Sequence, residues 1–317
     1  PDDSTQTIYV WLDALVNYIT KAGYPWDPSQ AHAGGWPADC QVIGKDIVRF
    51  HCIYWPAFLI ALGLPPPSRI LTHAHWTLGH SKMAKSTGNV VNPFFALDRF
   101  GVDTMRFYLA YDGGIENDSD YSNYHIINRY NNVLKDSLGG LTSRVLRGKG
   151  WSVRGSVERV REQLLEQPPE DELHRTHHGI VKALAKNMSQ EMDKLDSREA
   201  LFHITGAIAQ TNRFMHAAEP WKHVKPPDRT TTNNSDAAKE VDPTIFLCAE
   251  TLRIAGILLQ AYMPGKAAHL LDMLGVDQSM RTFEHAQLGA DADYGVSKVE
   301  LGKRWMGALF PPLTSDE

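Results

Sequence analysis

Cysteine is scarce in this sequence, which has three among 317 residues, and no two of them have C-x-x-C spacing. Cys40, Cys52 and Cys248 are odd in number and far apart along the chain. This pattern argues against a disulfide framework and against a structural zinc site within the chain. We therefore expect free thiols in a reducing compartment and no metal bound by these residues.

Long apolar runs are missing as well. None reaches the roughly 18–20 residues that a bilayer-spanning helix needs, so we expect no membrane-embedded segment. The opening stretch, PDDSTQTIYV, lacks the basic and apolar regions of a signal peptide, and its two aspartates are atypical of a transit peptide. It is typical of the middle of a longer protein, and we expect the chain to be part of one.

An excess of basic charge is also lacking, because the net charge is −5 at pH 7. No global positive field attracts nucleic acid, so an RNA partner would have to meet a local basic patch. The fractions of hydrophobic and charged residues, 43% and 22%, are ordinary for a globular protein, and the length allows two domains.

The first third of the chain combines strand and helix patterns. Three β-rich runs lie at 7–15, 39–47 and 68–76. The second predicts a buried strand that ends at Gly44. Apolar residues over 47–62 then recur at helical spacing, and Gly63 fits the position after the helix. This strand–helix–strand order within about 35 residues predicts a parallel βαβ unit.

Helix boundaries are marked clearly after residue 90. Asn92 is a candidate N-cap, Pro93 fits the first helical position and Gly101 fits the end of this helix. A second helix is expected to follow, with Asp103 as its N-cap.

Beyond about residue 120, apolar residues recur only at spacings of three and four, which predicts a helical bundle. Residues 225–240 are predicted to form a polar loop. Asp242 and Pro243 then fit the start of a helix that is apolar nearly all round and lies centrally. The change of pattern near residue 115 predicts an α/β domain over 1–114 and an all-α domain over 115–317.

The stretch HSKMAKSTGN, residues 80–89, places Lys82 and Lys85 three positions apart on a turn. Each lysine is a compact charge with three donors on a long stem, which suits a polyphosphate. Aimed at a leaving pyrophosphate, the two ammonium groups would stabilise the charge that develops in the transition state. Taken alone, the pair is more typical of a solvated surface turn than of a phosphate site.

The stretch KMAKSTGN resembles the K-M-S-K-S loop of class I aminoacyl-tRNA synthetases, with Ala84 in place of the serine. YVWLDALVNYI, at 9–19, and VIGKDIVRFHCIYWPAFLIALGLPPP, at 42–67, resemble two motifs of methionyl-tRNA synthetases in particular. The resemblance runs from about residue 7 to the end of the chain and is strongest over 7–110. It implies the second half of a Rossmann-like catalytic domain, followed by an all-α anticodon-binding bundle.

The resemblance also assigns site residues. It implies that Lys82 and Lys85 are catalytic. The implied ATP-binding residues are Gly44, Asp46, Lys82, Met83, Lys85 and Ser86. The implied methionine-binding residues are Trp11, Ala14, Tyr18, Ile47, His51 and Trp55. The implied anticodon-binding residues are Arg144, Asn212 and Trp221.

Two of these assignments can be argued from the residues themselves. Ile47, His51 and Trp55 are four apart and share one helix face, which alone would be core packing. His51 is polar and needs a partner there, and the resemblance implies that Tyr18 is this partner. Asp46 follows the carboxyl end of a strand, where open α/β sheets bind ligands. It fits either a ribose contact or the N-cap of the following helix.

In the helical part, L-G-G-L-T-S-R at 138–144 resembles a family motif, with Gly140 where an asparagine is usual. Trp221 follows Pro220, so we expect its ring on a loop, either stacked on an RNA base or packed in a corner. Other basic residues fit either phosphate contacts or a solvated face. These are Arg147, Lys149, Arg154, Lys222 and Lys225.

The histidine-rich stretch HRTHHG, at 174–179, has no carboxylate or cysteine at ligand spacing. The polarity of a helix start explains it, so no metal is predicted here either.

The H-I-G-H motif of class I synthetases is absent from the sequence. The family resemblance therefore implies a methionine–tRNA ligase whose N-terminal catalytic half is missing from this chain, which we expect to be inactive alone. Its implied partners are methionine, ATP with Mg²⁺, tRNA(Met) and that missing half. The expected compartment is the mitochondrial matrix, with the cytoplasm as the alternative. The competing hypothesis is a non-catalytic tRNA-binding protein derived from a synthetase.

Overall fold

The computed structural model describes residues 3–5, 10–27, 29–30, 34–224, 235–303 and 306–313. Backbone contacts divide the chain into two compact units. The first unit comprises Pro1–Asn89 and Gly114–Asp120, and the second comprises Val90–Gly113 and Tyr121–Glu317. The functional division into 1–114 and 115–317 stays a prediction.

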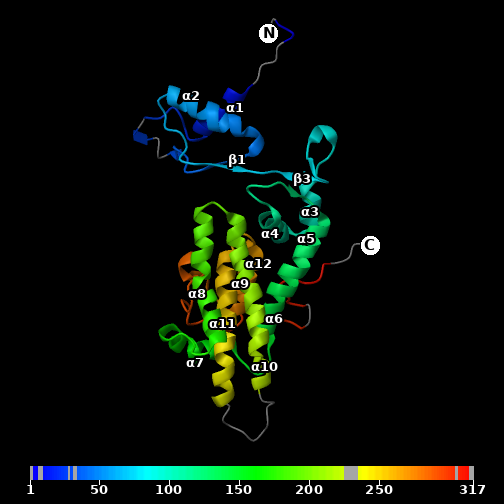
Figure 1. The fold of residues 1–317 in the computed structure, drawn as a ribbon, viewed down its shortest axis with the longest axis vertical. Coiled ribbons are helices and arrows are strands. Elements are labelled where there is room, and N and C mark those ends of the chain that lie inside the picture. The colour runs from blue at the N-terminus through cyan, green and yellow to red at the C-terminus, as the bar shows by residue number, and fades with distance from the viewer. Residues whose placement is uncertain are drawn as a thin grey trace. The chain divides into compact units, whose positions relative to one another are not determined.

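The first unit contains the predicted βαβ arrangement (Figure 1). Strands β1 (Gln41–Gly44) and β2 (Ile70–His73) are parallel, with Gln41 opposite Ile70. The segment between them carries helix α2 (Trp55–Ala61), and Gly63 follows it at φ +70°. The predicted parallel pairing and the position of Gly63 are therefore confirmed.

The run at 7–15 was predicted to begin as a strand, and this prediction is wrong from Trp11 onward. Helix α1 spans Trp11–Lys21, and its side chains Leu15 and Ile19 are buried. Their spacing of four places both on one face of a helix, which outweighs the β-rich composition of the preceding residues. Residues 7–9 lie outside the described part of the chain.

A second, three-stranded sheet in this unit has the order β4-β3-β5. Strand β3 (Trp76–Leu78) is antiparallel to β4 (Ser81–Lys82) and parallel to β5 (Ser119–Asp120). The two residues of the β3–β4 turn, Gly79 and His80, have φ of +59° and +58°. Positive φ at both positions is typical of a type I′ hairpin turn.

The second unit begins with α3 (Pro93–Phe100) and α4 (Val102–Asp112). Asn92 caps α3 by accepting a hydrogen bond from the backbone N–H of Phe94, as predicted. Asp103 does not cap α4, because its carboxylate accepts from the backbone N–H of Lys266 in another helix instead.

The remaining elements of the second unit are helical, as predicted (Figure 1). The first helix runs from α5 (Asn123–Arg129) through a π-helical segment (Tyr130–Gly139) into α6 (Gly140–Arg147). The others are α7 (Val153–Glu166), α8 (Glu172–Asp193), α9 (Ser197–Ala218), α10 (Pro220–His223), α11 (Ser235–Leu259) and α12 (Pro264–Leu274). Short 3-10 turns follow at Gln278–Met280 and Phe283–His285.

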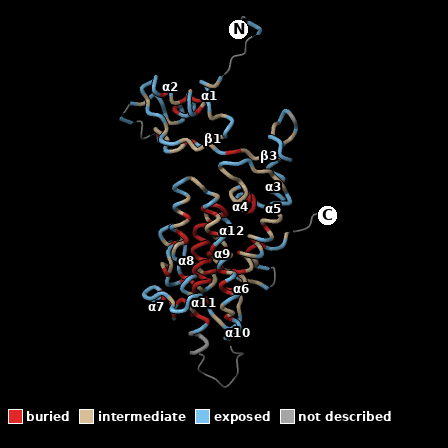
Figure 2. Tube along the Cα trace, in the orientation of Figure 1, coloured by how far each residue is buried: buried red, intermediate tan, exposed pale blue. Residues whose placement is uncertain are grey.

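Helix α11 forms the centre of this bundle, as its apolar composition predicted. Buried residues concentrate in α8, α9, α11 and α12 (Figure 2). Phe246, Leu252 and Ile254 of α11 are fully buried. Among the described residues, no helix is both long enough and apolar enough to cross a bilayer.

The predicted start of α11 is wrong. The helix begins at Ser235 and contains Pro243 in its interior, so 235–240 is helical rather than part of a loop. Asp242 is buried and accepts hydrogen bonds from Ser156 and Arg159, and these contacts occupy the carboxylate that would otherwise cap a helix. The rest of the predicted loop, 225–234, lies outside the described residues.

Candidate functional site

The lysine turn is a β-hairpin followed by a short loop. Lys82 lies opposite Thr77 across the β3–β4 pair. Lys85 lies in a 3-10 turn, Lys85–Thr87, and its side chain is exposed. Gly88, at φ +68°, ends this turn, and a bridge between Ala84 and Asn89 closes the loop. Met83 and Ser86 lie on the same loop, so all four candidate phosphate-side residues are local to it.

Asp46 is the contact point of the lysine loop. Its Oδ2 is 3.1 Å from Nζ of Lys82, and its Oδ1 is 3.2 Å from Nε2 of His75. The hydrogen bond from Lys82 is the largest factor that lowers the pKa of Asp46. Asp46 lies within a 3-10 turn, Lys45–Ile47, whose N-cap is Gly44, so its own N-cap interpretation is wrong.

Gly44 is required by this arrangement. A Cβ atom at this position would lie 3.0 Å from Oδ1 of Asp46 and 3.3 Å from Nε2 of His75. Both groups would have to move, because these distances are shorter than ordinary contacts. The glycine therefore gives the strand end the space in which the carboxylate and the imidazole meet.

His51 has the hydrogen-bond partner predicted for it. Its Nε2 is 2.9 Å from the hydroxyl oxygen of Tyr18, and its Nδ1 is 3.0 Å from the carbonyl oxygen of Ile47. Because a carbonyl oxygen only accepts, Nδ1 carries a proton, and Nε2 of the neutral ring accepts from the tyrosine hydroxyl. The imidazole is thus held in one orientation between two elements.

Aromatic rings surround this imidazole. Trp11 stacks on Phe50 with a centroid distance of 3.9 Å and lies edge-on to His51 at 6.1 Å. Trp55 is fully buried and lies 5.9 Å from Tyr18 and 6.0 Å from Trp36, centroid to centroid.

The segment that carries His51 departs from the helix that was predicted over 47–62. Phe50–Tyr54 is π-helical and leads into α2 at Trp55. Such π-helical turns are rare in proteins overall, and those that occur often lie at functional sites. His51 and Trp55 are nevertheless both buried, so the predicted shared face is present.

The lysine loop and the aromatic cluster are connected through two adjacent residues. Asp46 binds Lys82, while the carbonyl group of Ile47 binds His51. Of the six residues proposed for methionine, five therefore lie in or beside one cluster. The sixth, Ala14, is exposed on α1. Trp36 and His75 were not predicted, because tryptophan–proline and lone histidine carry no spacing signal.

In the second unit, Arg144 and Asn212 are in direct contact. The guanidinium of Arg144 donates to the side-chain oxygen of Asn212. The amide of Asn212 donates to the carbonyl and hydroxyl oxygens of Ser137, both at 3.2 Å, and to the carbonyl of Ile208 at 3.0 Å. Burial lowers the pKa of Arg144. A Cβ at Gly140 would lie 3.3 Å from Nη1 of Arg144, so the glycine leaves room for the folded arginine.

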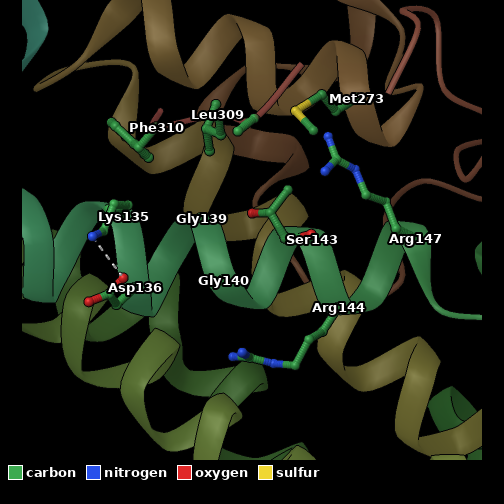
Figure 3. Close-up of a pocket in the computed structure, with 12 residues that line it drawn as sticks. Lys135, Asp136, Gly139, Gly140, Ser143, Arg144, Arg147, Met273, Leu309 and Phe310 are labelled. Atoms are coloured by element: carbon green, nitrogen blue, oxygen red, sulfur yellow. Dashed lines mark ion pairs between the residues drawn. The ribbon is translucent and has the colours of Figure 1, made fainter. Parts of the chain in front are cut away.

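A pocket of about 400 Å³ lies on another side of the same helix (Figure 3). Leu309, Phe310 and Met273 form one wall, and Lys135 pairs with Asp136 at 3.4 Å. Figure 3 shows Arg147 directed toward Met273 and Arg144 directed away from that wall.

The basic residues around α6 are partly used inside the bundle. Arg147 donates to the carbonyl groups of Leu301, Met306 and Gly307. Arg154 donates to Glu158 at 2.7 Å and to the carbonyl of Ala292 at 2.6 Å. Both arginines therefore fasten the C-terminal segment.

The predicted basic patch also includes three lysines. Lys222 pairs with Glu219 at 2.6 Å, and Lys149 is exposed. Lys225 lies outside the described residues.

Trp221 was expected on a loop, and this is wrong. Glu219 adopts a left-handed conformation, at φ +44°, and Pro220 then starts the short helix α10, which contains Trp221. The indole is 42% exposed and lies edge-on to His216 at 5.8 Å. One face of the ring system is thus available to solvent.

The histidines of 174–179 are not explained by helix-start polarity alone. His177 is buried, stacks on Phe214 at 4.2 Å and has its pKa lowered to about 4 by burial. His178 contacts the carbonyl of Leu164 at 3.0 Å. Within the described part of the chain, no group of three or more His, Cys, Asp and Glu side chains could hold a metal ion.

Comparisons with known proteins agree with this geometry. Residues 1–146 match the family of class I tRNA synthetases designated (M). The chain is 51% identical over 322 residues to a probable mitochondrial methionine–tRNA ligase of Neurospora crassa, covering 100% of this chain and 50% of that protein. It is 38% identical over 322 residues to a mitochondrial methionine–tRNA ligase of Xenopus laevis, covering 100% and 54%.

A solved structure is similar over nearly the whole chain. It is the methionyl-tRNA synthetase of Mycobacterium tuberculosis bound by methionyl-adenylate, with a TM-score of 0.77 and 30% identity. The match covers 98% of this chain and 57% of that one. The chain thus spans about half the length of the curated relatives it matches.

Proposed function

We propose that this chain, which belongs to the methionyl-tRNA synthetase family, takes part in the ATP-dependent activation of methionine and in the transfer of methionine to tRNA(Met). The observation that carries the proposal is the connected set of contacts from Lys82 through Asp46 and Ile47 to His51. It links the ammonium group of Lys82 and the aromatic cluster through one short turn.

In the proposed activation step, a carboxylate oxygen of methionine attacks the α-phosphorus of ATP. The new bond forms methionyl-adenylate, and the bond from the α-phosphorus to the bridging oxygen breaks, so that pyrophosphate leaves with the electron pair. Lys82 and Lys85 stabilise the negative charge that develops on the leaving group. A ribose hydroxyl of the terminal adenosine of the tRNA then attacks the carbonyl carbon of the adenylate, which forms the ester while the bond to the phosphate oxygen breaks and AMP leaves. Magnesium arrives with ATP as part of the substrate.

For ATP, we assign the ribose to Asp46 and the strand end at Gly44. Lys82 now occupies one oxygen of Asp46. Triphosphate binding transfers the ammonium group from this exposed pair to the phosphates and leaves the carboxylate to accept from ribose hydroxyls. Met83 and Ser86 are assigned to the nucleotide because they lie on the same loop.

For methionine, we assign the aromatic cluster of Trp11, Tyr18, His51 and Trp55, with Ile47 beside it. Ala14, exposed on α1, is assigned to the same substrate. A thioether is polarizable and packs well against aromatic rings. The fixed hydrogen bond between His51 and Tyr18 places a polar group in this otherwise apolar surface, and it gives the pocket a means to discriminate among apolar amino acids.

For tRNA(Met), we assign Arg144, Asn212 and Trp221 to the anticodon. The half-buried guanidinium of Arg144 is held by Asn212, and the exposed indole of Trp221 offers a stacking surface. Gly140 stands where the family usually has an asparagine. Base recognition in this protein therefore relies on Arg144 rather than on a side chain at position 140.

The compartment and the completeness of the site are parts of the same proposal. We assign the protein to the mitochondrial matrix because the fungal and frog relatives are named as mitochondrial, with the cytoplasm as the alternative. Because the sequence contains no H-I-G-H motif, the activation step requires a catalytic half that carries one.

Methionine-dependent exchange of pyrophosphate into ATP tests this proposal. The chain is assayed alone and after joining to the H-I-G-H-bearing half of the Neurospora relative, with that half alone as the control. Exchange is expected only in the joined protein. Exchange by the chain alone would contradict the need for a second half, and its absence from a folded joined protein would contradict the ligase function. Anticodon-dependent tRNA binding in that last case would favour a non-catalytic tRNA-binding protein.

A further inference from the structure

Two aspartates outside the predicted site, Asp118 and Asp120, contact the groups that form it. Both belong to the segment Gly114–Asp120, which returns to the first unit after α3 and α4 have left it. Strand β5 pairs in parallel with β3, and this pairing places Asp120 opposite Thr77. The segment thus reaches the hairpin that carries Lys82.

Asp120 fastens the base of this hairpin. Its Oδ1 accepts from the hydroxyl of Thr77 at 2.6 Å and from the backbone N–H of His80 at 2.8 Å. Thr77 is the residue that lies opposite Lys82 in the β3–β4 pair. His80 has a positive φ of 58°, a backbone conformation that residues other than glycine rarely adopt. One carboxylate oxygen therefore holds both the strand beside the lysine and the strained turn before it.

Asp118 fastens the other side of the site. Its Oδ1 accepts from Nζ of Lys45 at 2.6 Å and from the backbone N–H of His75 at 2.8 Å. Lys45 directly precedes Asp46, and the imidazole of His75 contacts the carboxylate of Asp46. Asp118 therefore fixes two neighbours of the residue that binds Lys82.

We propose that Asp118 and Asp120 are positioning residues that hold Asp46 and the lysine hairpin in register, so that ribose and polyphosphate are bound at a fixed separation. This rests on the proposed function, and neither carboxylate is assigned a contact with substrate. Asp118 directly precedes β5 and Asp120 lies within it, so one short segment carries both carboxylates. The hydrogen bonds from the hydroxyl of Thr77 and the backbone N–H of His80 lower the pKa of Asp120 and thus favour its charged form.

Acylation of Lys82 tests the positioning directly on the full 317-residue chain. The rate at which a trace acylating reagent modifies this amine is measured by mass spectrometry in Asp120→Ala, Thr77→Val and Asp120→Asn. The first two remove the hydrogen bond between Asp120 and Thr77, and the third keeps an acceptor oxygen without the charge. Because the Lys82–Asp46 pair is exposed, its loss is expected to raise the rate by up to about fivefold.

The conservative variant and a matched control complete this experiment. Asp120→Asn is expected to react at nearly the wild-type rate. Asp277→Ala serves as the control, since Asp277 also accepts from a nearby hydroxyl and a backbone N–H, at Ser279 in the second unit. Unchanged Lys82 reactivity in both Asp120→Ala and Thr77→Val would overturn the proposal, even if the first variant were poorly folded.

A kinetic measurement separates positioning from sheet stability. In the joined protein, Asp120→Ala is expected to lower kcat for pyrophosphate exchange on the order of 10²-fold, with KM for methionine unchanged and with recovery in Asp120→Asn. Unchanged kcat would overturn the positioning role while leaving the proposed function intact. Conversely, a wild type with protected Lys82 but no exchange would overturn the proposed function alone, because acylation requires no catalysis.

Discussion

The two units of this protein are stabilised in different ways. Among the described residues of the first, the apolar cluster has five buried side chains, and the candidate site consists of exposed charged groups joined by hydrogen bonds. The second has a far larger core built on α11 (Figure 2). A small core suffices for the first because polar contacts among the hairpin, the 3-10 turn and the segment Gly114–Asp120 fix the site. The second instead holds the residues proposed to contact RNA on well-packed helices.

The same contrast appears in their ion pairs. Lys82 and Asp46 have side chains that are 66% and 46% exposed, whereas those of Arg253 and Glu250 in α11 are fully buried. An exposed pair contributes little to stability and is free to exchange partners with a ligand. A buried pair is costly to break, because the remaining charge is left without a partner. The first is suited to a binding site and the second to a fixed core.

The largest expected effect comes from breaking the buried pair. Glu250→Ala leaves the guanidinium of Arg253 in the core without its carboxylate partner. It also removes the oxygen that accepts a hydrogen bond from the backbone N–H of Gly289. We expect the free energy of unfolding of the second unit to fall by about 3–5 kcal/mol in urea denaturation. Glu191→Ala, which removes the surface partner of Lys194, is the control and should change it by less than about 1 kcal/mol.

Truncation in the small core should separate the two units. Leu59 is fully buried, and Leu59→Ala is expected to cost about 2–5 kcal/mol. Because its apolar cluster is so small, the first unit should then lose amide protection over 11–21 and 41–44 while α11 keeps it. Hydrogen exchange followed by mass spectrometry measures both. Equal loss of protection in α11 would show that the units unfold together.

The buried His177 should make the second unit sensitive to acid. Its pKa is about 4 when folded and ordinarily 6.5, so between these values the unfolded chain binds a proton that the folded chain excludes. Stability is therefore complete above pH 6.5 and falls toward pH 4, by as much as about 3 kcal/mol. His177→Asn should flatten this dependence in denaturation curves, while His216→Gln, at an exposed position of α9, should preserve it.

The smallest effect is expected at the RNA side. Trp221→Ala should weaken tRNA(Met) binding by about 1–3 kcal/mol through lost base stacking, without changing the melting temperature. Phe283→Ala is the matched control, because Phe283 is an exposed ring, 48% accessible, in the same unit. Fluorescence titration with tRNAs of altered anticodon measures the difference. Equal losses for both variants would remove the assignment of Trp221.

Local signals in the sequence predicted the features that depend on neighbouring residues. Asn92 caps α3 and Gly63 follows α2, each by a short-range rule of helix capping. The family resemblance supplied the residues of the lysine loop, which contact Asp46, and those of the aromatic cluster, which contact Ile47. It also supplied Tyr18 as the partner of His51. These expectations required no knowledge of distant contacts.

The sequence could not predict features that depend on distant partners. Asp103 and Asp242 looked like N-caps, but each carboxylate is engaged by a residue far along the chain. The π-helical turn at Phe50–Tyr54 has the same apolar spacing as an ordinary helix. Asp118 and Asp120 acquire their roles only when β5 pairs with β3.

The central claim is that the ammonium groups of Lys82 and Lys85 stabilise the leaving pyrophosphate. Its most direct test is methionine-dependent exchange by the joined protein with Lys82→Ala or Lys85→Ala, beside Lys186→Ala at an exposed position of α8. We predict that each loop variant lowers kcat by about 10²–10³-fold and leaves KM for methionine and the exchange rate of the Lys186 variant unchanged. Wild-type exchange rates in both loop variants would contradict the account.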